Sequence, residues 1–386
     1  MMKKLKQTKG ITLVALVLTI IILLILAGIS IQALTNQGLF AQAQNAKNLT
    51  EQKTAEESAT LREYEEQIGI ATGDKNYTAA KTIAEAQTDD MLTKKVNSPI
   101  VDAYGNKITV PAGFKIKVDD TTNNATTVDK GIVIIDNNEN EFVWIPTGKI
   151  YTDTAKTESN AKTINLNRYT FDSNGNPTAQ NDAVIEGWCQ ELATSTRGNT
   201  TAKDINDFKT KASSTGSGGF YIGRYEARTV TARTAETDPI TILTTKASEY
   251  VYNYVTQIQA ADLARNMYKD STKFTSDLMN SYAWDTATLF LQTFGTNSTY
   301  SRQTRVSSSY ASTGTNNQTT KDVQCNVYDM ASNVLEWTTE TGVAGSMYIN
   351  RGGVYWNNDD YTGHRYGYGL ASVDTVSFRP ILYINI

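Results

Sequence analysis

Three hydrophobic patterns divide the chain. Residues 11–31 form an uncharged and almost wholly apolar run, which as a helix at ~1.5 Å per residue would extend about 31 Å, the thickness of bilayer hydrocarbon. Residues 39–68 are rich in Ala, Gln, Glu and Lys with few apolar positions, which predicts an exposed helical stalk. From about Asn97, short apolar runs alternate with turn residues, a pattern typical of β-strands and hairpins.

The third region contains candidate strands and helices. Strands are predicted at 107–118, 131–135, 141–145 and 219–226, helices at 254–267 and 275–294, and long loops in the Thr-, Ser- and Asn-rich residues 150–218. Strands followed by helices and then by turn-rich strands indicate the α+β class. We therefore divide the chain into a leader (1–10), a membrane helix and stalk (11–70), a linker (71–96) and an α+β domain (97–386).

The charges give the apolar run an orientation. Lys3, Lys4, Lys6 and Lys9 precede it, and the positive-inside rule places residues 32–386 outside the membrane. An ordinary secretory signal and a plain membrane anchor remain alternatives. The formal net charge is −4 with these lysines included, so the rest of the chain is more acidic still. An acidic chain without a basic patch argues against nucleic acid as a partner.

Residues 9–16, KGITLVAL, resemble a type IV prepilin leader. The resemblance implies cleavage after Gly10, so that Ile11 becomes the new N-terminus and residues 11–31 remain as the membrane helix. Most pilins carry a glutamate at the fifth mature position, which pairs with the terminal amine of a neighbouring subunit, and this chain has Ala15 there. A minor or tip pilin, with other pilus subunits as partners, or a pilin-like membrane anchor is therefore expected rather than a major fibre subunit.

Six short motifs occur in an order that resembles the formylglycine-generating enzyme family, also called the sulfatase-modifying factor family. They are FVWIP (142–146), GFYIGRYE (219–226), DLMNSYAW (277–284), VYDMASNVLEW (327–337), RGG (351–353) and SFRP (377–380). The resemblance implies that residues 97–386 form a C-type-lectin-like domain of the α+β class.

The residues that enzymes of this family need are missing. Copper-dependent members use a cysteine pair close to the Arg-Gly-Gly motif, and residues 354–361 contain no cysteine. Iron-dependent relatives use several histidines, whereas His364 is the single histidine of this chain. One histidine completes neither a facial metal site nor a conventional triad. We therefore assign no catalytic residue and keep a formylglycine-type oxidase only as an alternative.

Two assignments stay open between alternatives. Asn333 and Glu336 are candidate calcium ligands, as comparable residues are in some relatives. The other interpretation is that Asn333 caps a turn and Glu336 pairs with a cation such as Arg379. Cys189 and Cys325 are the only cysteines, and they either form one disulfide in an exported protein or remain buried thiols.

The segment 354–377 has the composition of a contact surface. It is rich in Tyr, Asp, Asn and Gly and contains no Lys, Glu, Gln or Met, a mixture shared with antibody loops. Tyrosines that pack the last hairpins of the domain are the alternative, although so much Asp, Asn, Gly and Arg is unusual in a core. The candidate ligand-binding residues are Tyr355, Asn357, Asn358, Asp359, Asp360, Tyr361, His364, Tyr366 and Tyr368.

The same segment resembles the variable region of diversity-generating retroelement target proteins. Many of these have a C-type-lectin-like fold, with Arg-Gly-Gly before and Phe-Arg-Pro after the variable loop. The resemblance implies that template adenines are randomised, so that asparagine codons become Tyr, Asp, His, Ser or Gly. Trp356 cannot arise in this way and is expected to be an invariant packing residue. We therefore expect a non-catalytic, membrane-anchored or pilus-tip protein that binds an external protein or glycan, with a minor structural pilin as the alternative.

Overall fold

The computed structural model describes two parts of the chain, which belong to separate units, residues 1–68 and 69–386. In the first it describes only Ala46, Lys47, Thr50, Lys53, Tyr64 and Ile68, and in the second residues 80–119, 124–180, 184–185, 189–191, 202–306, 322–343, 347–369 and 373–385. The proposed cleavage site, Gly10 and Ile11, and the apolar run 11–31 lie outside these residues, and so do most of the stalk and residues 71–79. The predictions for them stay predictions.

The six described residues of the first unit are all helical and all exposed. Thr50 Oγ1 donates a hydrogen bond of 2.8 Å to the carbonyl oxygen of Ala46, one turn earlier. These six residues lie in the stretch predicted to be a stalk, and the stalk itself stays a prediction. None of the helices within the described residues is both long and apolar enough to cross a membrane.

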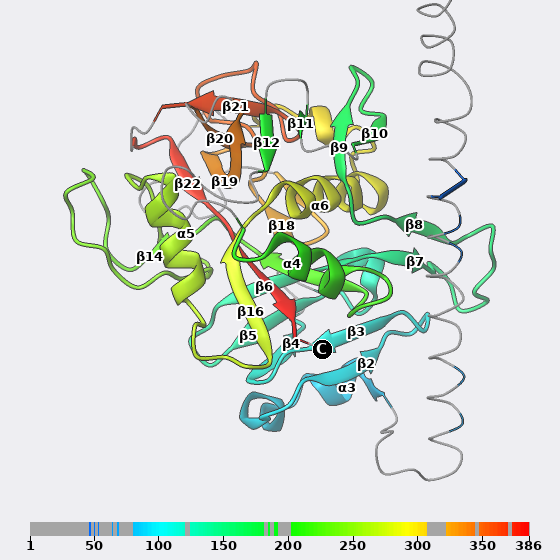
Figure 1. Cartoon of the computed structure of the whole chain (residues 1–386). Helices are drawn as coiled ribbons and strands as arrows, with labels where there is room; N and C mark the ends of the chain where they lie inside the picture. Colours follow the sequence, from blue (N-terminus) through cyan, green and yellow to red (C-terminus); the bar gives the residue numbers. More distant parts are fainter. Residues whose placement is uncertain are drawn as a thin grey trace, which may run out of the picture. The chain divides into compact units, whose positions relative to one another are not determined.

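The second unit is a mixed α+β domain, as the sequence predicts, and its described strands include two six-stranded sheets (Figure 1). The first, the β13 sheet, is antiparallel and has the order β16-β23-β13-β6-β5-β4. Its strands are β4 (Phe114–Lys117), β5 (Val133–Asp136), β6 (Glu141–Pro146), β13 (Gly219–Gly223), β16 (Phe274–Leu278) and β23 (Pro380–Ile384).

The second, the β19 sheet, has the order β11-β12-β19-β20-β21, with β22 parallel to β19. Its strands are β11 (Val184–Ile185), β12 (Cys189–Glu191), β19 (Leu335–Gly342), β20 (Tyr348–Arg351), β21 (Arg365–Tyr368) and β22 (Val376–Phe378). The candidate segment 354–377 includes β21 and the start of β22 in this sheet.

Short strands and helices complete the described domain. The remaining strands are β1 (Lys81–Thr82), β2 (Ser98–Val101), β3 (Lys107–Val110), β7 (Gly148–Ile150), β8 (Lys162–Ile164), β9 (Arg168–Phe171), β10 (Pro177–Gln180), β14 (Arg228–Thr229), β15 (Tyr250–Val251), β17 (Val323–Gln324) and β18 (Val327–Tyr328). The helices are α3 (Ile83–Ala86), α4 (Ile205–Ala212), α5 (Gln257–Asn266) and α6 (Ser281–Phe294), with 3-10 turns η1 (Asp89–Thr93), η2 (Val128–Lys130) and η3 (Tyr300–Arg302).

Helix α6 lies between the two sheets (Figure 1) and contacts both β6 and β19. Asn280 caps its start by accepting a hydrogen bond of 2.9 Å from the backbone N–H of Ala283. Trp284, Phe290 and Leu291 are fully buried, and burial of each such side chain stabilises the fold by about 1.5–3 kcal/mol. The helix is therefore a rigid support from which its polar residues can reach the β19 sheet.

The structure corrects three boundaries drawn from the sequence. The helix expected at 275–294 begins only at Ser281, because residues 274–278 pair with β23 as β16. The loops expected at 150–218 contain β8, β9, β10 and α4, whose Phe208 packs against the rings of Phe220 and Tyr383. The folded unit also begins within the stretch that we assigned to a linker, since β1 pairs with β2 and Met91 is buried. In each case contacts with distant residues stabilise a segment with a weak local pattern.

One turn recurs in three hairpins, between β2 and β3, β5 and β6, and β9 and β10. Each turn begins with an Asp and ends with an Asn four residues later. One Asp oxygen accepts from the backbone N–H groups two and four residues on, and the other accepts from the Asn amide, all at 2.8–3.0 Å. The fourth residue has a positive φ and is Gly105, Glu139 or Gly175, at 80°, 64° and 81°. These turns set the register of their hairpins.

Candidate ligand-binding loop

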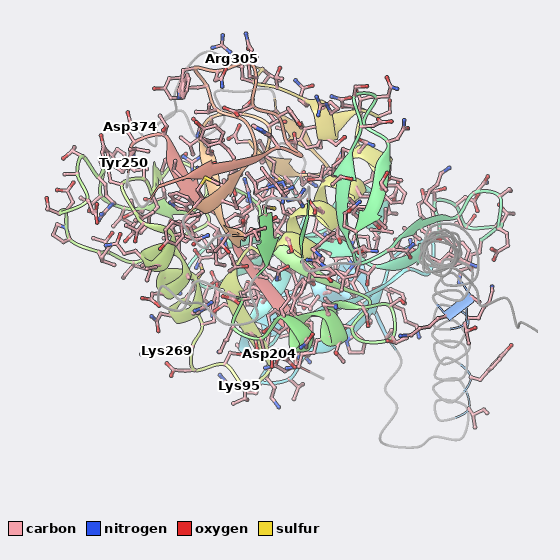
Figure 2. All side chains as sticks on the ribbon, turned by 45° about the horizontal axis from the view of Figure 1, so that its top comes forward. Lys95, Asp204, Tyr250, Lys269, Arg305 and Asp374 are labelled. Atoms are coloured by element: carbon pink, nitrogen blue, oxygen red, sulfur yellow. The ribbon has the colours of Figure 1, made fainter. Side chains whose placement is uncertain are left out.

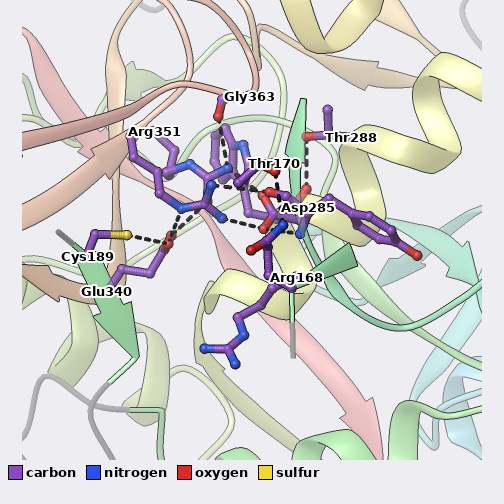
Figure 3. A network of polar contacts seen from close by, with 12 residues as sticks. Arg168, Thr170, Cys189, Asp285, Thr288, Glu340, Arg351 and Gly363 are labelled. Carbon is purple, nitrogen blue, oxygen red and sulfur yellow. Dashed lines mark hydrogen bonds and ion pairs between the residues drawn. The ribbon is translucent and has the colours of Figure 1, made fainter. Parts of the chain in front are cut away.

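The candidate loop, residues 352–364, connects β20 and β21, and two arginines lie opposite each other at its base. Arg351 and Arg365 are register partners in this antiparallel pair. Arg351 binds Glu340 at 2.7 Å and Asp285 at 2.5 Å, and Arg365 binds the same Glu340 at 2.7 Å and also Asp285. The four side chains are fully buried and form a closed ring of alternating charges, part of which Figure 3 shows.

Charge balance in this ring determines how Glu340 ionises. Burial by itself would raise its pKa, but the positive charges of Arg351 and Arg365 and their hydrogen bonds outweigh burial and lower the pKa to about 2. Arg351 also donates to the carbonyl oxygen of His364 at 2.8 Å. Both ends of the loop are thus attached to carboxylates on α6 and β19.

The Arg-Gly-Gly motif has a steric explanation. Gly352 has a φ of 87°, a conformation that glycine adopts without strain. A Cβ atom on Gly352 would lie 2.6 Å from the carbonyl oxygen of Met330, and one on Gly353 would lie 2.0 Å from that of Ala331. The two glycines therefore allow the start of the loop to lie directly against the backbone of residues 330–331.

The far side of the loop is held by α6, by η3 and by the residue that follows η3. Trp284 Nε1 donates to the carbonyl oxygen of Thr362 at 2.8 Å. The backbone N–H groups of Thr362 and Gly363 donate to the carbonyl oxygens of Gln303 and Ser301 at 3.1 and 2.9 Å. The loop thus has a defined conformation before any ligand binds.

A chain of polar contacts runs inside the loop from Asn357 through Asp360 to His364. Asp360 Oδ2 accepts from Asn357 Nδ2 at 2.9 Å, and Asp360 Oδ1 lies 2.8 Å from His364 Nδ1. Asp360 is only 3% exposed, so its carboxylate braces the loop. The prediction that Asp360 belongs to the contact surface is therefore wrong for its side chain.

A row of rings flanks this brace. Tyr361 and His364 are stacked with centroids 4.9 Å apart and planes at 25°, and Tyr366 meets His364 edge-on at 6.1 Å. The guanidinium of Arg302 lies 3.6 Å from the centroid of the Tyr361 ring, an arrangement in which the cation is attracted by the ring face. The stacked rings and the cation limit the motion of Tyr361 and His364.

Several predicted contact residues do reach the surface. Asn358 and Asp359 are exposed, Tyr366 is 40% exposed, and Tyr355, Asn357, Tyr361 and His364 are half-buried. The side chain of Tyr368 lies outside what the structure describes, although its backbone belongs to β21.

Trp356 departs from the sequence prediction. It was expected to be a packing residue, but it is 57% exposed. Its ring therefore belongs to the exposed side chains of the loop. We name Trp356, Asn358, Asp359 and Tyr366 the loop face.

Two arginines of the site were not predicted from the sequence. Arg305 Nε donates to Asn358 Oδ1 at 2.6 Å, and its Nη1 donates to the carbonyl oxygen of Tyr355. Figure 2 shows Arg305 at the rim of the folded unit, on the side opposite Lys95 and Asp204. No motif marked Arg302 or Arg305, because they precede the loop by some fifty residues and meet it only in the folded domain.

The candidate calcium ligands have other partners in the structure. Glu336 binds Arg379 through both carboxylate oxygens, at 2.5 and 3.0 Å, which is the ion pair that we gave as the alternative. Asn333 has a φ of 66°, and its amide nitrogen donates to both oxygens of Glu226 at 2.9 Å. Burial raises the pKa of Glu336 to about 7, and pairing with Arg379 offsets this only in part.

These contacts make Asn333 and Glu336 parts of a buried polar cluster. Among the residues that the structure describes, no group of three or more His, Cys, Asp or Glu is arranged to hold a metal ion. We therefore withdraw the calcium assignment, because an ion at Glu336 would have to displace the guanidinium of Arg379.

Both cysteines are free thiols, which is the second of the two alternatives left open by their spacing. The Cys189 thiol is buried and lies 3.8 Å from Glu340 Oε1 (Figure 3). Cys325 is half-buried, and burial raises the pKa of its thiol to about 12. A thiol with such a pKa is a poor nucleophile at neutral pH.

Comparisons with known proteins assign no family to this chain. No protein-family model matches the sequence, and no match is found among curated proteins. The function therefore has to be argued from the geometry of loop 352–364 and from the resemblances of the motifs.

Proposed function

We propose that this chain is a surface-displayed ligand-binding protein, an adhesin or receptor, that presents loop 352–364 to an external protein or glycan. One observation carries the proposal: the base of the loop is fixed by the buried ring of Arg351, Arg365, Asp285 and Glu340, while the loop face is exposed. A rigid scaffold that supports exposed side chains is the usual construction of a binding site on a loop.

The chemistry of the loop face supports binding rather than catalysis. Tryptophan, tyrosine and arginine supply most of the binding energy at protein interfaces, and Tyr and Trp lose little conformational entropy when they bind. The internal hydrogen bonds of the loop reduce the further entropy that a ligand would have to overcome. Asn358 and Asp359 place hydrogen-bonding groups next to Trp356, which suits a ligand with a mixed polar and apolar surface.

A C-type-lectin-like fold is part of the proposal, and the positions of five of the six motifs support it. Glu226, Glu336 and Arg379 come from three different motifs and lie in one buried cluster, where the charge of Arg379 acts on both carboxylates. Trp284 and Arg351 come from two others and are also in contact, with the guanidinium 5.5 Å from the indole ring. Residues of these motifs thus form the buried contacts of the domain that supports the loop.

We propose further that a pilin-like N-terminus anchors the domain outside the membrane and that a retroelement diversifies the loop face. Positions of the loop face accommodate many side chains, because their contacts contribute little to folding. Asp360 and Gly353 have fixed internal roles. Variation is therefore expected at Asn358, Asp359 and Tyr366, and Asp360 and Gly353 are expected to stay constant.

Deep sequencing of the locus and its flanks in a cultured population tests the diversification. We expect adenine-directed substitutions confined to codons 354–377, together with an adjacent near-copy of the segment and a reverse transcriptase gene. A uniform locus without a template would overturn the diversification and leave a receptor of fixed specificity or a minor pilin.

A binding experiment tests the receptor function itself. The full chain in detergent micelles is screened against immobilised glycans and against a displayed library of random peptides. We expect binders that are lost in Trp356→Ala and Tyr366→Ala but retained in Ile242→Ala, which alters an exposed apolar residue outside the loop. If binding is unchanged by both Trp356→Ala and Tyr366→Ala, the loop face is not the binding site.

A further inference from the structure

We propose that Asp360 is a positioning residue that selects one tautomer of His364, so that Nε2 is presented to a ligand as a hydrogen-bond acceptor. This inference rests on the proposed function and adds the chemistry that the site recognises, namely a hydrogen-bond donor on the ligand. The observation that carries it is the contact of 2.8 Å between Asp360 Oδ1 and His364 Nδ1.

The first step concerns the direction of this hydrogen bond. A carboxylate oxygen accepts hydrogen bonds, and a neutral imidazole has one N–H donor and one acceptor nitrogen. Asp360 already accepts from the Asn357 amide through its other oxygen. With Nδ1–H donating to Asp360, the proton of the neutral ring is on Nδ1, and Nε2 carries a free lone pair.

The second step concerns the ring orientation. Tyr361 stacks on one face of the imidazole and Tyr366 contacts it edge-on. A flip about the Cβ–Cγ bond would keep these two ring contacts but replace Nδ1 by Cδ2 and so lose the hydrogen bond to Asp360. Charged groups near His364 include Asp360 on the Nδ1 side of the ring, Arg302, which lies over Tyr361, and Arg351, which donates to the His364 carbonyl oxygen. The geometry therefore fixes Nδ1 toward the interior of the loop.

The third step concerns access to the other nitrogen. The His364 side chain is 28% exposed, whereas that of Asp360 is 4% exposed. Within the described part of the chain, no hydrogen bond is formed by Nε2. Since Nδ1 faces Asp360, we infer that the exposed part of the ring includes Nε2, to which a ligand hydroxyl or amide N–H can donate.

Asp360, which holds the loop from inside, and the exposed Asp359 are adjacent residues of the same type. Asp359 therefore provides a matched control. Asp359 is exposed, and its carboxylate forms none of the hydrogen bonds of the brace, to which only its backbone N–H donates. Asp359→Ala and Asp360→Ala each remove one negative charge and one carboxylate from the same turn. A general electrostatic effect of the loop would appear in both variants, and selection of the tautomer only in the second.

Nitrogen NMR of the imidazole tests the proposal, because His364 is the single histidine of the chain. The full chain in detergent micelles is labelled with ¹⁵N in histidine only, and solid-state spectra are recorded at about pH 8.5, above the ordinary imidazole pKa of about 6.5. We expect Nδ1 to show the shift of a protonated nitrogen and Nε2 that of an unprotonated one. The same pattern is expected in Asp359→Ala, and a mixture of both tautomers in Asp360→Ala.

The wild-type spectrum alone can overturn the proposal, so the result does not depend on whether a variant folds. A protonated Nε2, or an even mixture of tautomers, contradicts it, and so does an Asp359→Ala variant that shifts the tautomer as far as Asp360→Ala. No ligand is present in the measurement. Failure of the tautomer assignment is therefore distinct from failure of the binding function, which the screen tests separately.

Discussion

Arg351 and Arg365 face each other where the β20–β21 hairpin opens into its loop, and both bind Asp285 and Glu340. These ion pairs attach the two ends of the candidate loop to Asp285 on α6 and Glu340 on β19. Since the charges balance, each member compensates the desolvation of the others. The ring explains how a loop with several exposed polar residues remains in one conformation.

Removing one arginine of the ring should therefore strongly destabilise the folded domain. We expect Arg351→Met to lower the free energy of unfolding by about 3–5 kcal/mol, because it leaves two buried carboxylates with one cation. Urea denaturation of the full chain measures the change. Arg305→Ala is the control, since Arg305 is half-buried and should cost no more than about 1 kcal/mol. Equal costs for the two variants would contradict a special role of the ring.

Acid should weaken the same ring. The pKa of Glu340 is about 2 in the folded state and has a reference value of 4.5. The folded pKa is the lower one, so the contribution is complete above pH 4.5 and is lost as the pH falls towards 2. Unfolding free energies measured across this window should fall steeply in the wild type and less steeply in Glu340→Gln. If the unfolding free energy fell equally steeply with pH in both proteins, the pKa of Glu340 would not be lowered by the ring.

Asp322 should show the opposite pH dependence. Its carboxylate accepts hydrogen bonds from Tyr300 and Ala331, and burial raises its pKa from 3.8 to about 6. The folded state therefore binds a proton that the unfolded state does not, and stability from this residue is lost as the pH rises from 3.8 to about 6. We expect this part of the pH profile to be absent in Asp322→Asn. A profile unchanged by the substitution would show that Asp322 ionises normally.

The loop face should tolerate substitution. We expect Trp356→Ala to change the free energy of unfolding by no more than about 1 kcal/mol, because surface substitutions have small effects. Trp337→Ala is the matched core variant, since its ring is buried and Nε1 donates to Val255 at 2.9 Å, and it should cost about 3–5 kcal/mol. Thermal melting of both variants makes the comparison. If Trp356→Ala melted as early as Trp337→Ala, the loop face would be part of the core.

The three Asp–Asn turns predict a stabilising substitution. Glu139 has a φ of 64° where the corresponding residues of the other turns are Gly105 and Gly175. A side chain in the left-handed region costs roughly 1–2 kcal/mol, and glycine recovers part of it after its own entropic cost. We expect Glu139→Gly to raise the free energy of unfolding by about 0.5 kcal/mol, and Gly175→Ala to lower it by about 1 kcal/mol. Destabilisation by Glu139→Gly would imply that the side chain of Glu139 contributes more than its weak pairing with Lys246 suggests.

The local sequence pattern was sufficient to predict an element where that element is long or strongly apolar. Strand β6 covers the apolar run predicted at 141–145 and one residue more, β13 lies within 219–226, and α5 lies within 254–267. The local pattern was insufficient for β16. Its sequence predicts the start of a helix, but in the folded domain it is a strand paired with β23. The local pattern also missed α4, which has only two buried residues, Phe208 and Ala212, to mark its inner face.

Composition identified the candidate loop but not the role of each residue in it. Asp359 and Asp360 are neighbours of the same type, yet one is exposed and the other is buried between Asn357 and His364. Trp356 was expected to pack because it cannot arise from an asparagine codon by adenine changes, and it is exposed instead. Arg302 and Arg305 could not be linked to the loop from the sequence, since nothing in their local pattern refers to residues about fifty positions away.

By itself, the sequence determined the α+β class, the main apolar strands and the candidate segment 354–377 after the Arg-Gly-Gly motif, because these depend on short-range periodicity and composition. Only the tertiary structure decided that Asp285 and Glu340 clamp both arginines, that Glu336 is committed to Arg379, and which side chains of the loop are exposed. The physical reason is that burial and ion pairing are set by contacts between residues far apart in the chain, and local sequence carries little information about which of those contacts form.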